Sequence, residues 1–578
     1  MMKQGDDLSW NDGAEEYLSS IFLTNTDLST ASDQLASHIK DWPTQYHLDR
    51  RRTNLLRPLR LGPNTRVLDV GAGTGVMSRY VAETGASVLA VEGDPTRAEL
   101  ASTRCEGTSV EVRCGSIQKI DDSDGFDVVL AIGVLEYATG QAGGAVDFLG
   151  QLADLVRPGG VLVIAIENQF GLAYLLGANE DHLSQPWIGL EGYPTGEAGV
   201  RTFSRKKLNF LLKGVGLSEQ KWFYPFPDYK LPIAILSENT YREPDVVDLV
   251  DQLAGSPIAP ERMGETAGAD TRAVHRELLE AGMGPEIANS FLVVAATDQA
   301  ALENRTNQDV LAWRFTGDRL RCYLGERRIR TNNGVRQIDR LRSYSRETIP
   351  KSWLIHQGED PLTDNYLTGP TLEQSALSRL RSKDVDGLKR LLNDFHAWIT
   401  PQLTKPTAET EPHPYLPTYI EKIAPGYCID AGFDNLVPNG TSLQLVDKEW
   451  QIETGVDPEL AIIRTLWKLA STIILSSTKH PWPSNTTVDE LTLILCGLYP
   501  LPISPKPLER FYKAEAELLT VVCGGSPSEH EQSLKTAGQR SNKNLENESK
   551  LLDKLRSRFA WLKNLPGGHV LAKITRRR

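Results

Sequence analysis

Several features are scarce in this sequence, and each scarcity excludes a class of protein. No apolar run reaches the roughly 18 residues of a membrane-spanning helix, and the first residues, Met1 to Asp7, are polar and acidic, unlike a secretory signal. Positive charge is not in excess, since the net charge of −12 argues against general nucleic-acid binding. We therefore expect a cytoplasmic protein that does not bind nucleic acid.

Cysteine is also sparse, with 6 residues in a chain of 578. The cysteines form no Cys-x-x-Cys pair, so we expect reduced thiols rather than a disulfide framework or a zinc site. They are Cys105, Cys114, Cys322, Cys428, Cys496 and Cys523.

The length of 578 residues exceeds what one hydrophobic core holds, so two or three domains are expected. The composition changes along the chain place a helical lead-in at 1–45 and an α/β domain at 46–298. That domain carries a polar, glycine-rich helical insertion at 240–288. An α+β domain at 299–500 follows, and 501–578 forms a helical linker and a basic tail.

Three glycines follow a short apolar run near the start of the α/β domain. Val67, Leu68 and Val70 lead into a turn, 71–75, with glycine at its first, third and fifth positions, and a helical pattern follows. This order predicts a buried strand that turns into a helix N-terminus, where free backbone N–H groups face a nucleotide-like ligand. A glycine cluster without a ligand is the alternative.

The spacing of the glycines distinguishes two cofactor classes. A dinucleotide fingerprint requires a glycine three residues after its second glycine, but Val76 stands there and Gly75 comes one residue earlier. Asp69 lies two residues before the first glycine. This D-x-G-x-G-x-G pattern resembles the first motif of class I S-adenosylmethionine-dependent methyltransferases. The resemblance implies that Asp69, Gly71, Gly73 and Gly75 bind S-adenosylmethionine.

Further cofactor contacts are expected at the ends of the next strands. Glu92 ends the second strand about twenty residues after the turn, where one carboxylate can accept both ribose hydroxyls. The resemblance adds Ser116, Ile117 and Ile132; Ser116 stands where these enzymes commonly have an Asp for the adenine amino group. Tyr46, in a helix before the first strand, either touches the cofactor or packs.

Five apolar strands alternate with helices between 66 and 168, which predicts a doubly wound parallel sheet with ligands at the carboxyl ends of its strands. The segments 222–236 and 289–296 are expected as the sixth and seventh strands. The predicted fold of 46–298 is thus a Rossmann-like, seven-stranded methyltransferase sheet.

A narrower resemblance rests on several stretches taken together. They are similar to methyltransferases encoded with bacterial surface-polysaccharide genes, a family that includes the methyltransferase–kinase that terminates O-antigen chains. The resemblance implies a glycan or lipid-linked saccharide acceptor and polysaccharide-assembly proteins as partners. The stretches are Tyr46-His-Leu, Val91-Glu-Gly, Ile166–Leu172, Asp181-His182, Arg201–Leu208 and Phe223–Pro232.

A hydroxyl acceptor benefits from a general base, and His182, after the fifth strand, is the predicted one. A surface or structural histidine is the alternative. Other candidates orient the substrate or hold an anionic acceptor; they are Asp181, Glu167, Asp228, Tyr229, Arg201 and Lys230.

The second half contains a D-x4-N, hairpin, D arrangement that resembles the catalytic loop and metal-binding Asp of protein-kinase-like phosphotransferases. The resemblance implies that Asp430 accepts a hydroxyl proton, while Asn435 and Asp447 hold magnesium for ATP. No His-Arg precedes Asp430, and no glycine-rich phosphate loop is visible. Chance spacing in an unrelated domain is the alternative.

The basic end of the chain combines an apolar helical face, which begins at Leu551, with positive charge up to Arg578. It either rests on the inner face of an anionic membrane, binds a partner, or is solvated. The predicted function is S-adenosylmethionine-dependent O-methylation of a glycan or sugar-phosphate. The alternatives are a non-catalytic, cofactor-binding scaffold with a pseudokinase and a bifunctional methyltransferase–kinase.

Overall fold

The computed structural model describes residues 12–542 with twelve short gaps. The gaps are 121–122, 141–143, 195–198, 260–261, 263–264, 267, 333, 345–346, 357–361, 407–411, 417–419 and 504–505. The predicted basic tail from Leu551 to Arg578 lies outside the described residues. Among the described helices, none combines the length and the apolar character that crossing a membrane requires.

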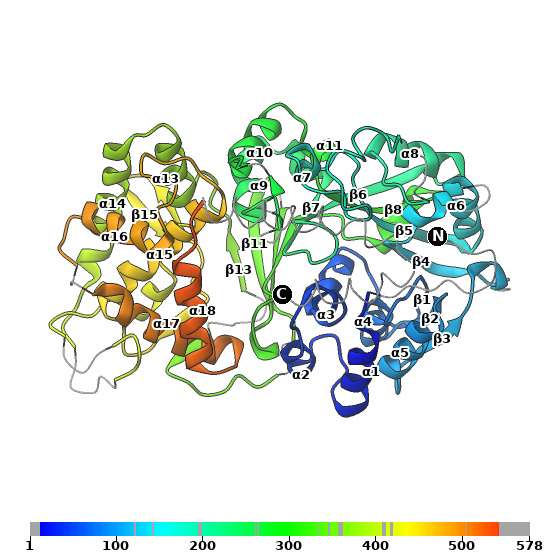
Figure 1. Ribbon diagram of the computed structural model, residues 1–578, viewed down its shortest axis with the longest axis horizontal. Coiled ribbons are helices and arrows are strands. Elements are labelled where there is room, and N and C mark those ends of the chain that lie inside the picture. The colour runs from blue at the N-terminus through cyan, green and yellow to red at the C-terminus, as the bar shows by residue number, and fades with distance from the viewer. Residues whose placement is uncertain are drawn as a thin grey trace, which may run out of the picture.

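A mixed sheet of twelve strands runs through the molecule (Figure 1), in the order β13-β11-β10-β9-β7-β6-β8-β5-β4-β1-β2-β3. The neighbours among its first five strands pair in parallel, in the order 3-2-1-4-5. Parallel strands that alternate with helices confirm the predicted Rossmann-like sheet, so all five strands end at the same edge. The strands are β1 Arg66–Val70, β2 Ser87–Glu92, β3 Val110–Cys114, β4 Phe126–Ile132 and β5 Val156–Glu167.

Helices cover both faces of the parallel strands, which explains why the strands are apolar throughout. Successive residues point to opposite faces: Val67 packs with α4 (Val76–Glu83), and Leu68 packs with α6 (Gly144–Asp154) and α8 (Arg205–Gly214). Helix α5 (Pro95–Cys105) connects β2 to β3.

The seventh strand predicted from the sequence is β8 (Ser290–Ala296), which lies antiparallel between β5 and β6 (Glu219–Phe226). The segment 222–236, predicted as one strand, instead forms a hairpin of β6 and β7 (Ala234–Ser237). Between β7 and β8 the chain is helical, as predicted for 240–288, with η4 (Glu238–Arg242), α9 (Val246–Ala254), α10 (Thr271–Glu280) and α11 (Gly284–Ile287).

The sheet does not end with the seven predicted strands. An unpaired β7 would expose a row of backbone N–H and C=O groups, and β9 (Val310–Phe315) pairs with it in antiparallel register. Three further antiparallel strands follow. They are β10 Gly325–Asn332, β11 Val335–Arg342 and β13 Leu362–Asn365. Helix α12 (Gln299–Arg305) connects β8 to β9, and η6 (Arg321–Tyr323) lies between β9 and β10.

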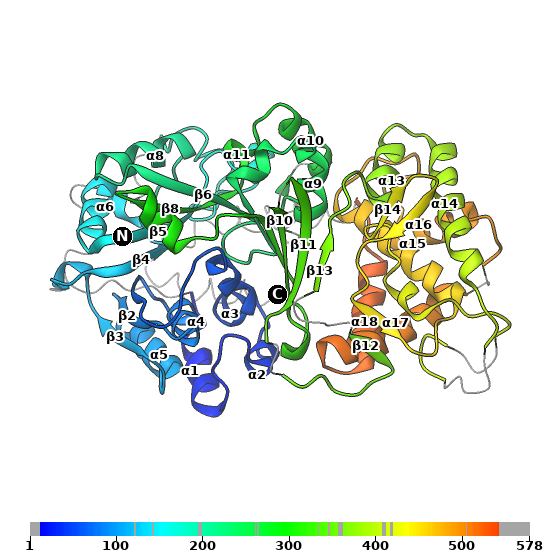
Figure 2. The same cartoon turned by 180° about the vertical axis from the view of Figure 1, so that it is seen from behind.

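A largely helical part lies beyond the β13 edge of the sheet, on the left in Figure 1 and on the right in Figure 2. It has its own hydrophobic core. Two small strand pairs join it, and the hairpin predicted at Asn439-Gly440 is confirmed by β14 (Leu436–Asn439) and β15 (Ser442–Leu445). The other pair is β12 (Leu354–His356) with β16 (Trp450–Ile452). Its helices are α13 Leu372–Arg381, α14 Val385–Ile399, η7 Thr400–Gln402, η8 Gly426–Asp430, α15 Pro458–Leu475, α16 Val488–Leu498, α17 Pro507–Cys523 and α18 Pro527–Gly538.

Four helical segments precede β1. They are α1 Glu15–Thr24, α2 Asp33–Ser37, α3 Trp42–Leu48 and the 3₁₀ helix η1 Arg50–Leu56. Helix α1 packs against α5, and η1 packs against α4, which follows the glycine turn.

Candidate active site

The glycine turn between β1 and α4 has the backbone geometry that the sequence predicts. Gly71, Gly73 and Gly75 have φ angles of +69°, +57° and +81°, in the left-handed region that favours glycine. A Cβ on Gly71 would lie 2.7 Å from the Val134 side chain, whereas a Cβ on Gly73 would meet no atom within 4 Å. The turn therefore leaves open space beside Gly73, which fits a ligand that approaches the backbone closely.

Glu92, at the end of β2, is held directly against this turn. Its Oε2 accepts a hydrogen bond from the Gly73 N–H at 2.7 Å, and its Oε1 accepts one from the Asp94 N–H at 2.9 Å. A carboxylate oxygen has two lone pairs, so each oxygen can accept one more donor. Burial raises the pKa of Glu92 despite these bonds. This geometry fits two vicinal ribose hydroxyls.

Asp69 stabilises the corner between β1 and α4, where the glycine turn lies. It is buried, and its Oδ2 accepts a hydrogen bond from the Ser78 hydroxyl at 2.6 Å, which ties β1 to α4. Burial raises its pKa to about 6. Asp69 therefore braces the strand–helix corner on which the turn depends.

The other predicted cofactor residues lie along the same edge, where β3 and β4 end. Ser116 caps η2 (Ile117–Lys119), with its Oγ accepting a hydrogen bond from the Gln118 N–H, and the Ile117 side chain is buried. Ile132 is the last residue of β4 and is also buried. Tyr46 lies on α3 with the Arg52 guanidinium 3.8 Å from its ring centroid. Their contacts with a cofactor stay predictions.

A histidine on α3 links the N-terminal helices to the turn, a contact that the sequence analysis missed. His47 Nδ1 lies 3.1 Å from the hydroxyl of Thr74, between Gly73 and Gly75, and its Nε2 lies 2.8 Å from Asp12 Oδ2. Burial lowers the pKa of His47. The N-terminal segment is thus fixed to the predicted cofactor site.

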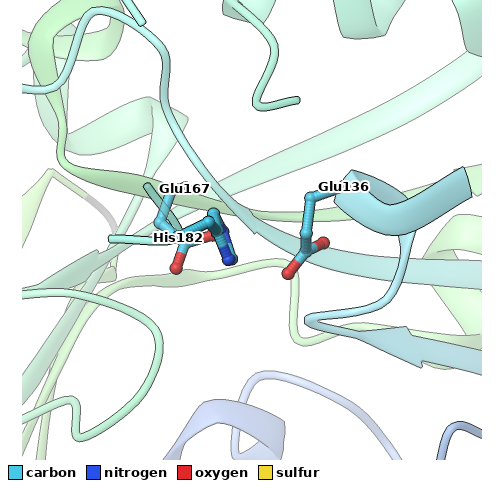
Figure 3. Close-up of side chains that lie close together, drawn as sticks. All are labelled: Glu136, Glu167 and His182. Atoms are coloured by element: carbon cyan, nitrogen blue, oxygen red, sulfur yellow. The ribbon is translucent and has the colours of Figure 1, made fainter. Parts of the chain in front are cut away.

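Three ionisable side chains, two of them buried, gather at the carboxyl ends of β4 and β5 (Figure 3). Glu136 lies in η3 (Leu135–Gly140) after β4, Glu167 ends β5, and His182 lies in the loop after α7 (Leu172–Leu175). One ligand atom from each falls within 4.8 Å of the others. Glu136 is 1% exposed, Glu167 3% and the His182 side chain 12%, so the two carboxyl groups are buried and the imidazole is partly buried.

The position of His182 is fixed by three neighbours. The hydroxyl of Tyr137 lies 3.1 Å from His182 Nδ1, and the two rings meet edge to face with centroids 5.3 Å apart. The backbone N–H of His182 donates to Glu180 Oε2 at 2.9 Å. These contacts direct Nε2 toward Glu167, whose Oε2 lies 3.6 Å away.

Two cations balance the acidic groups of this site. Lys230 Nζ lies 2.7 Å from Glu167 Oε1 and also pairs with Asp181. Arg262 contacts Asp181 Oδ1 at 2.7 Å. Asp228 Oδ1 accepts a hydrogen bond from the Lys230 N–H at 2.8 Å, which fixes the loop that carries the lysine.

Burial and mutual charge shift the pKa values of the cluster in different directions. Burial, with the Glu167 charge, raises the pKa of Glu136 to about 8. Burial would also raise the pKa of Glu167, but Lys230 and His182 hold it well below its usual range. Burial would lower the pKa of His182, yet the contact with Glu167 and the other carboxylates raises it to about 9. A low-pKa and a high-pKa carboxyl side by side are typical of functional sites.

The structure brings His182 and Glu167 together as the sequence suggested, but Glu136 was missed. Its signal in the sequence is a glutamate in the loop that follows the apolar strand β4. The guanidinium of Arg201, predicted to hold an anionic acceptor, instead donates to the Gly192 carbonyl at 2.9 Å. The Tyr229 hydroxyl packs against Gly133, where a Cβ would come within 2.7 Å of it.

In the second half, the structure brings Asp430 and Asn435 together and gives Asp447 an arginine partner. Asn435 Nδ2 donates to the Asp430 carbonyl at 3.1 Å, and the Trp450 N–H donates to Asp430 Oδ2 at 2.6 Å. Burial raises the pKa of Asp430 to about 7. Asp447 Oδ2 lies 2.6 Å from the Arg327 guanidinium, which supplies positive charge where magnesium was predicted. Binding of ATP and magnesium stays a prediction.

Comparisons with known proteins agree with the geometry of the first half. Residues 67–160 match the family described as "Methyltransferase domain". A ubiquinone biosynthesis O-methyltransferase of Rhodopseudomonas palustris (strain HaA2) is 32% identical over 127 residues, 21% of this chain and 48% of that protein. One of Methylocella silvestris is 34% identical over 124 residues, 19% of this chain and 47% of that protein.

The chain thus spans about half the length of the curated relatives it matches. A solved structure of an S-adenosylmethionine-dependent methyltransferase from Thermotoga maritima aligns at 15% identity and a TM-score of 0.27, covering 47% of this chain and all of that one. With the glycine turn, Glu92 and the strand order, the family match shows that this chain contains a class I S-adenosylmethionine-dependent methyltransferase domain.

Proposed function

We propose that the protein transfers the methyl group of S-adenosylmethionine to a hydroxyl oxygen of a glycan or sugar-phosphate in surface-polysaccharide biosynthesis. The observation that carries the proposal is the buried cluster of Glu136, Glu167 and His182. It lies at the same edge of the sheet as the glycine turn and Glu92. Polar groups that are buried beside a cofactor site are suited to holding an acceptor hydroxyl.

The chemistry requires little from the protein beyond alignment. S-adenosylmethionine, when bound, supplies a methyl group already activated by its sulfonium. Gly71 to Gly75 and Glu92 fix the cofactor end of the reaction, and the cluster orients the acceptor oxygen in line with the methyl carbon. The C–O bond forms as the C–S bond breaks, and the hydroxyl proton leaves to the cluster, in which the neutral form of His182 is the proposed acceptor; with a pKa of about 9, that form grows as the pH rises toward 9.

The acceptor class is supported by two features of this chain. The stretches around Glu167, His182 and Lys230 resemble methyltransferases of surface-polysaccharide biosynthesis, and the charged, hydrogen-bonding site suits a polyhydroxyl compound. Such an acceptor is lipid-linked at the cytoplasmic face of a membrane, so we also propose polysaccharide-assembly proteins as partners. The relatives named for ubiquinone biosynthesis make an acceptor from that biosynthesis the competing one.

The scaffold hypothesis, in which the domain binds its cofactor without turnover, makes a different prediction. Purified protein is incubated with S-adenosylmethionine and a saccharide panel, and products are read by mass spectrometry. The proposal expects a methylated saccharide, together with a loss of turnover but not of cofactor affinity in Glu167→Gln. Cofactor binding without any methylated saccharide supports the scaffold instead.

A further inference from the structure

The Glu136–Glu167–His182 cluster has the ligand types and spacing of a metal centre. It offers two carboxylates and one imidazole, and one ligand atom from each lies within 4.8 Å of the others. Glu136, on the helical turn η3, faces the Glu167–His182 pair, whose members come from a strand end and a loop (Figure 3). We propose that these three residues bind a divalent cation, and that the hydroxyls of the acceptor fill its remaining positions.

The distance between two of the proposed ligands supports a shared ion. His182 Nε2 and Glu167 Oε2 are 3.6 Å apart, which is too long for a hydrogen bond. Two ligands about 2.2 Å from one ion, at an angle near 110°, lie about 3.6 Å apart. Glu167 Oε2 accepts no hydrogen bond from any residue in the described part of the chain, although its side chain is only 3% exposed.

The neighbours of His182 and Glu167 leave His182 Nε2 and Glu167 Oε2 free to bind an ion between them. The Tyr137 hydroxyl, 3.1 Å from His182 Nδ1, can accept that N–H and so leave the lone pair on Nε2. Histidines that bind metals almost always donate their other N–H in this way. Lys230 binds Glu167 through Oε1 and leaves Oε2 toward His182.

The donor set indicates which ion and which acceptor suit the site. Carboxylate oxygens with an imidazole nitrogen suit first-row divalent cations such as Mn²⁺ or Zn²⁺, and two carboxylates match the charge of +2. Three protein ligands leave positions open, as in catalytic rather than structural sites. Two neighbouring saccharide hydroxyls can chelate the ion there. Its charge then lowers the pKa of a coordinated hydroxyl, so that the proton leaves to water, and His182 acts as a ligand of the ion in place of the base proposed above.

The cation site stands on geometry alone, whereas its role toward the acceptor rests on the proposed function. Full-length protein, stripped with a chelator, is titrated with Mn²⁺, and the free ion is followed by electron paramagnetic resonance. We expect one site, with Glu167→Gln and His182→Gln each weakening it at least tenfold. Glu286→Gln, on an exposed glutamate that pairs with Arg205, is the matched control and should bind normally.

Retained affinity for S-adenosylmethionine shows that each variant is folded. Absence of Mn²⁺ and Zn²⁺ binding, or equal binding in both variants, overturns the cation site. Methyl transfer that is undiminished in excess chelator overturns the role of the ion toward the acceptor and leaves the proposed function standing. Ion binding that depends on Glu167 and His182, without methylation of any saccharide in the presence of the ion, supports the site and contradicts the proposed function.

Discussion

Replacement of Glu92 by glutamine tests the cofactor site with the smallest change of shape. Each carboxylate oxygen accepts one backbone N–H, from Gly73 or Asp94, and retains a lone pair for one ribose hydroxyl. Glutamine keeps one acceptor oxygen but turns the other into a donor, which faces a backbone N–H. The variant therefore loses at least one charge-assisted hydrogen bond to the cofactor, worth about 1.5–3 kcal/mol.

That free energy corresponds to a loss of affinity of roughly 10- to 150-fold. Isothermal titration calorimetry with S-adenosylmethionine measures it directly. Glu111→Gln, the same change on an exposed strand residue that pairs with Arg113, should bind as the parent protein does. If Glu92→Gln binds within twofold of the parent while its circular dichroism is unchanged, the assignment of Glu92 to the ribose is refuted.

Three further predictions concern stability and are checked by chemical denaturation. Gly71→Ala should lower the free energy of unfolding by more than Gly73→Ala does. Both variants lose about 1–2 kcal/mol because alanine disfavours a left-handed φ, but only the Gly71 variant adds a contact of 2.7 Å with the Val134 side chain. Equal costs would contradict this account of the turn. Arg272→Met should destabilise by about 3 kcal/mol, because it removes the guanidinium that lies 2.9 Å from the buried Asp251, which keeps Arg276, and 2.8 Å from the partly buried Glu373; a loss below 1 kcal/mol would argue against it. Burial lowers the pKa of His275 from 6.5 to about 4. The unfolded chain therefore binds the proton first, and stability should fall by about 3 kcal/mol as the pH drops from 6.5 to 4. His275→Gln should remove that part of the acid sensitivity, and an unchanged pH profile would count against it.

The cofactor half of the site was predictable because its signals are local. Gly71 to Gly75 lie within five residues, and Glu92 follows at the spacing that one helix and one strand impose. The strand order also followed from alternating strands and helices, since such connections allow few arrangements. Local spacing was therefore enough to predict the turn and the carboxylate that the structure brings to it.

The acceptor half of the site was only partly predictable because it is assembled from distant segments. Glu136, Glu167, His182 and Lys230 come from four loops or strand ends, and no sequence spacing relates them. Glu136 carries no local motif, so only the fold reveals that it approaches Glu167. The charged groups around the predicted base His182 also come from distant segments, so the sequence did not predict its raised pKa.

The extension of the sheet was missed for a different physical reason. Strand β7 has only four residues, and the hairpin between Phe226 and Ala234 makes the segment look like one long strand. Its partner β9 begins at Val310, after the helical insertion and β8. Two strands so far apart in the sequence pair because the backbone N–H and C=O groups at the edge of the sheet need partners, and this requirement leaves no pattern in the sequence. A boundary near residue 298 therefore looked natural, although the sheet continues past it.

Methyl transfer to a saccharide is the most direct test of the central claim. Purified protein, supplied with Mn²⁺, S-adenosylmethionine carrying a labelled methyl group and a panel of surface-polysaccharide fragments, is assayed by mass spectrometry. The account predicts a gain of about 14 Da for an unlabelled methyl, correspondingly more for the label, on one hydroxyl oxygen. It also predicts that Gly73→Arg, which fills the open space beside the turn, abolishes the gain. Failure of the parent protein to bind S-adenosylmethionine, or labelled product that persists in Gly73→Arg, would contradict it.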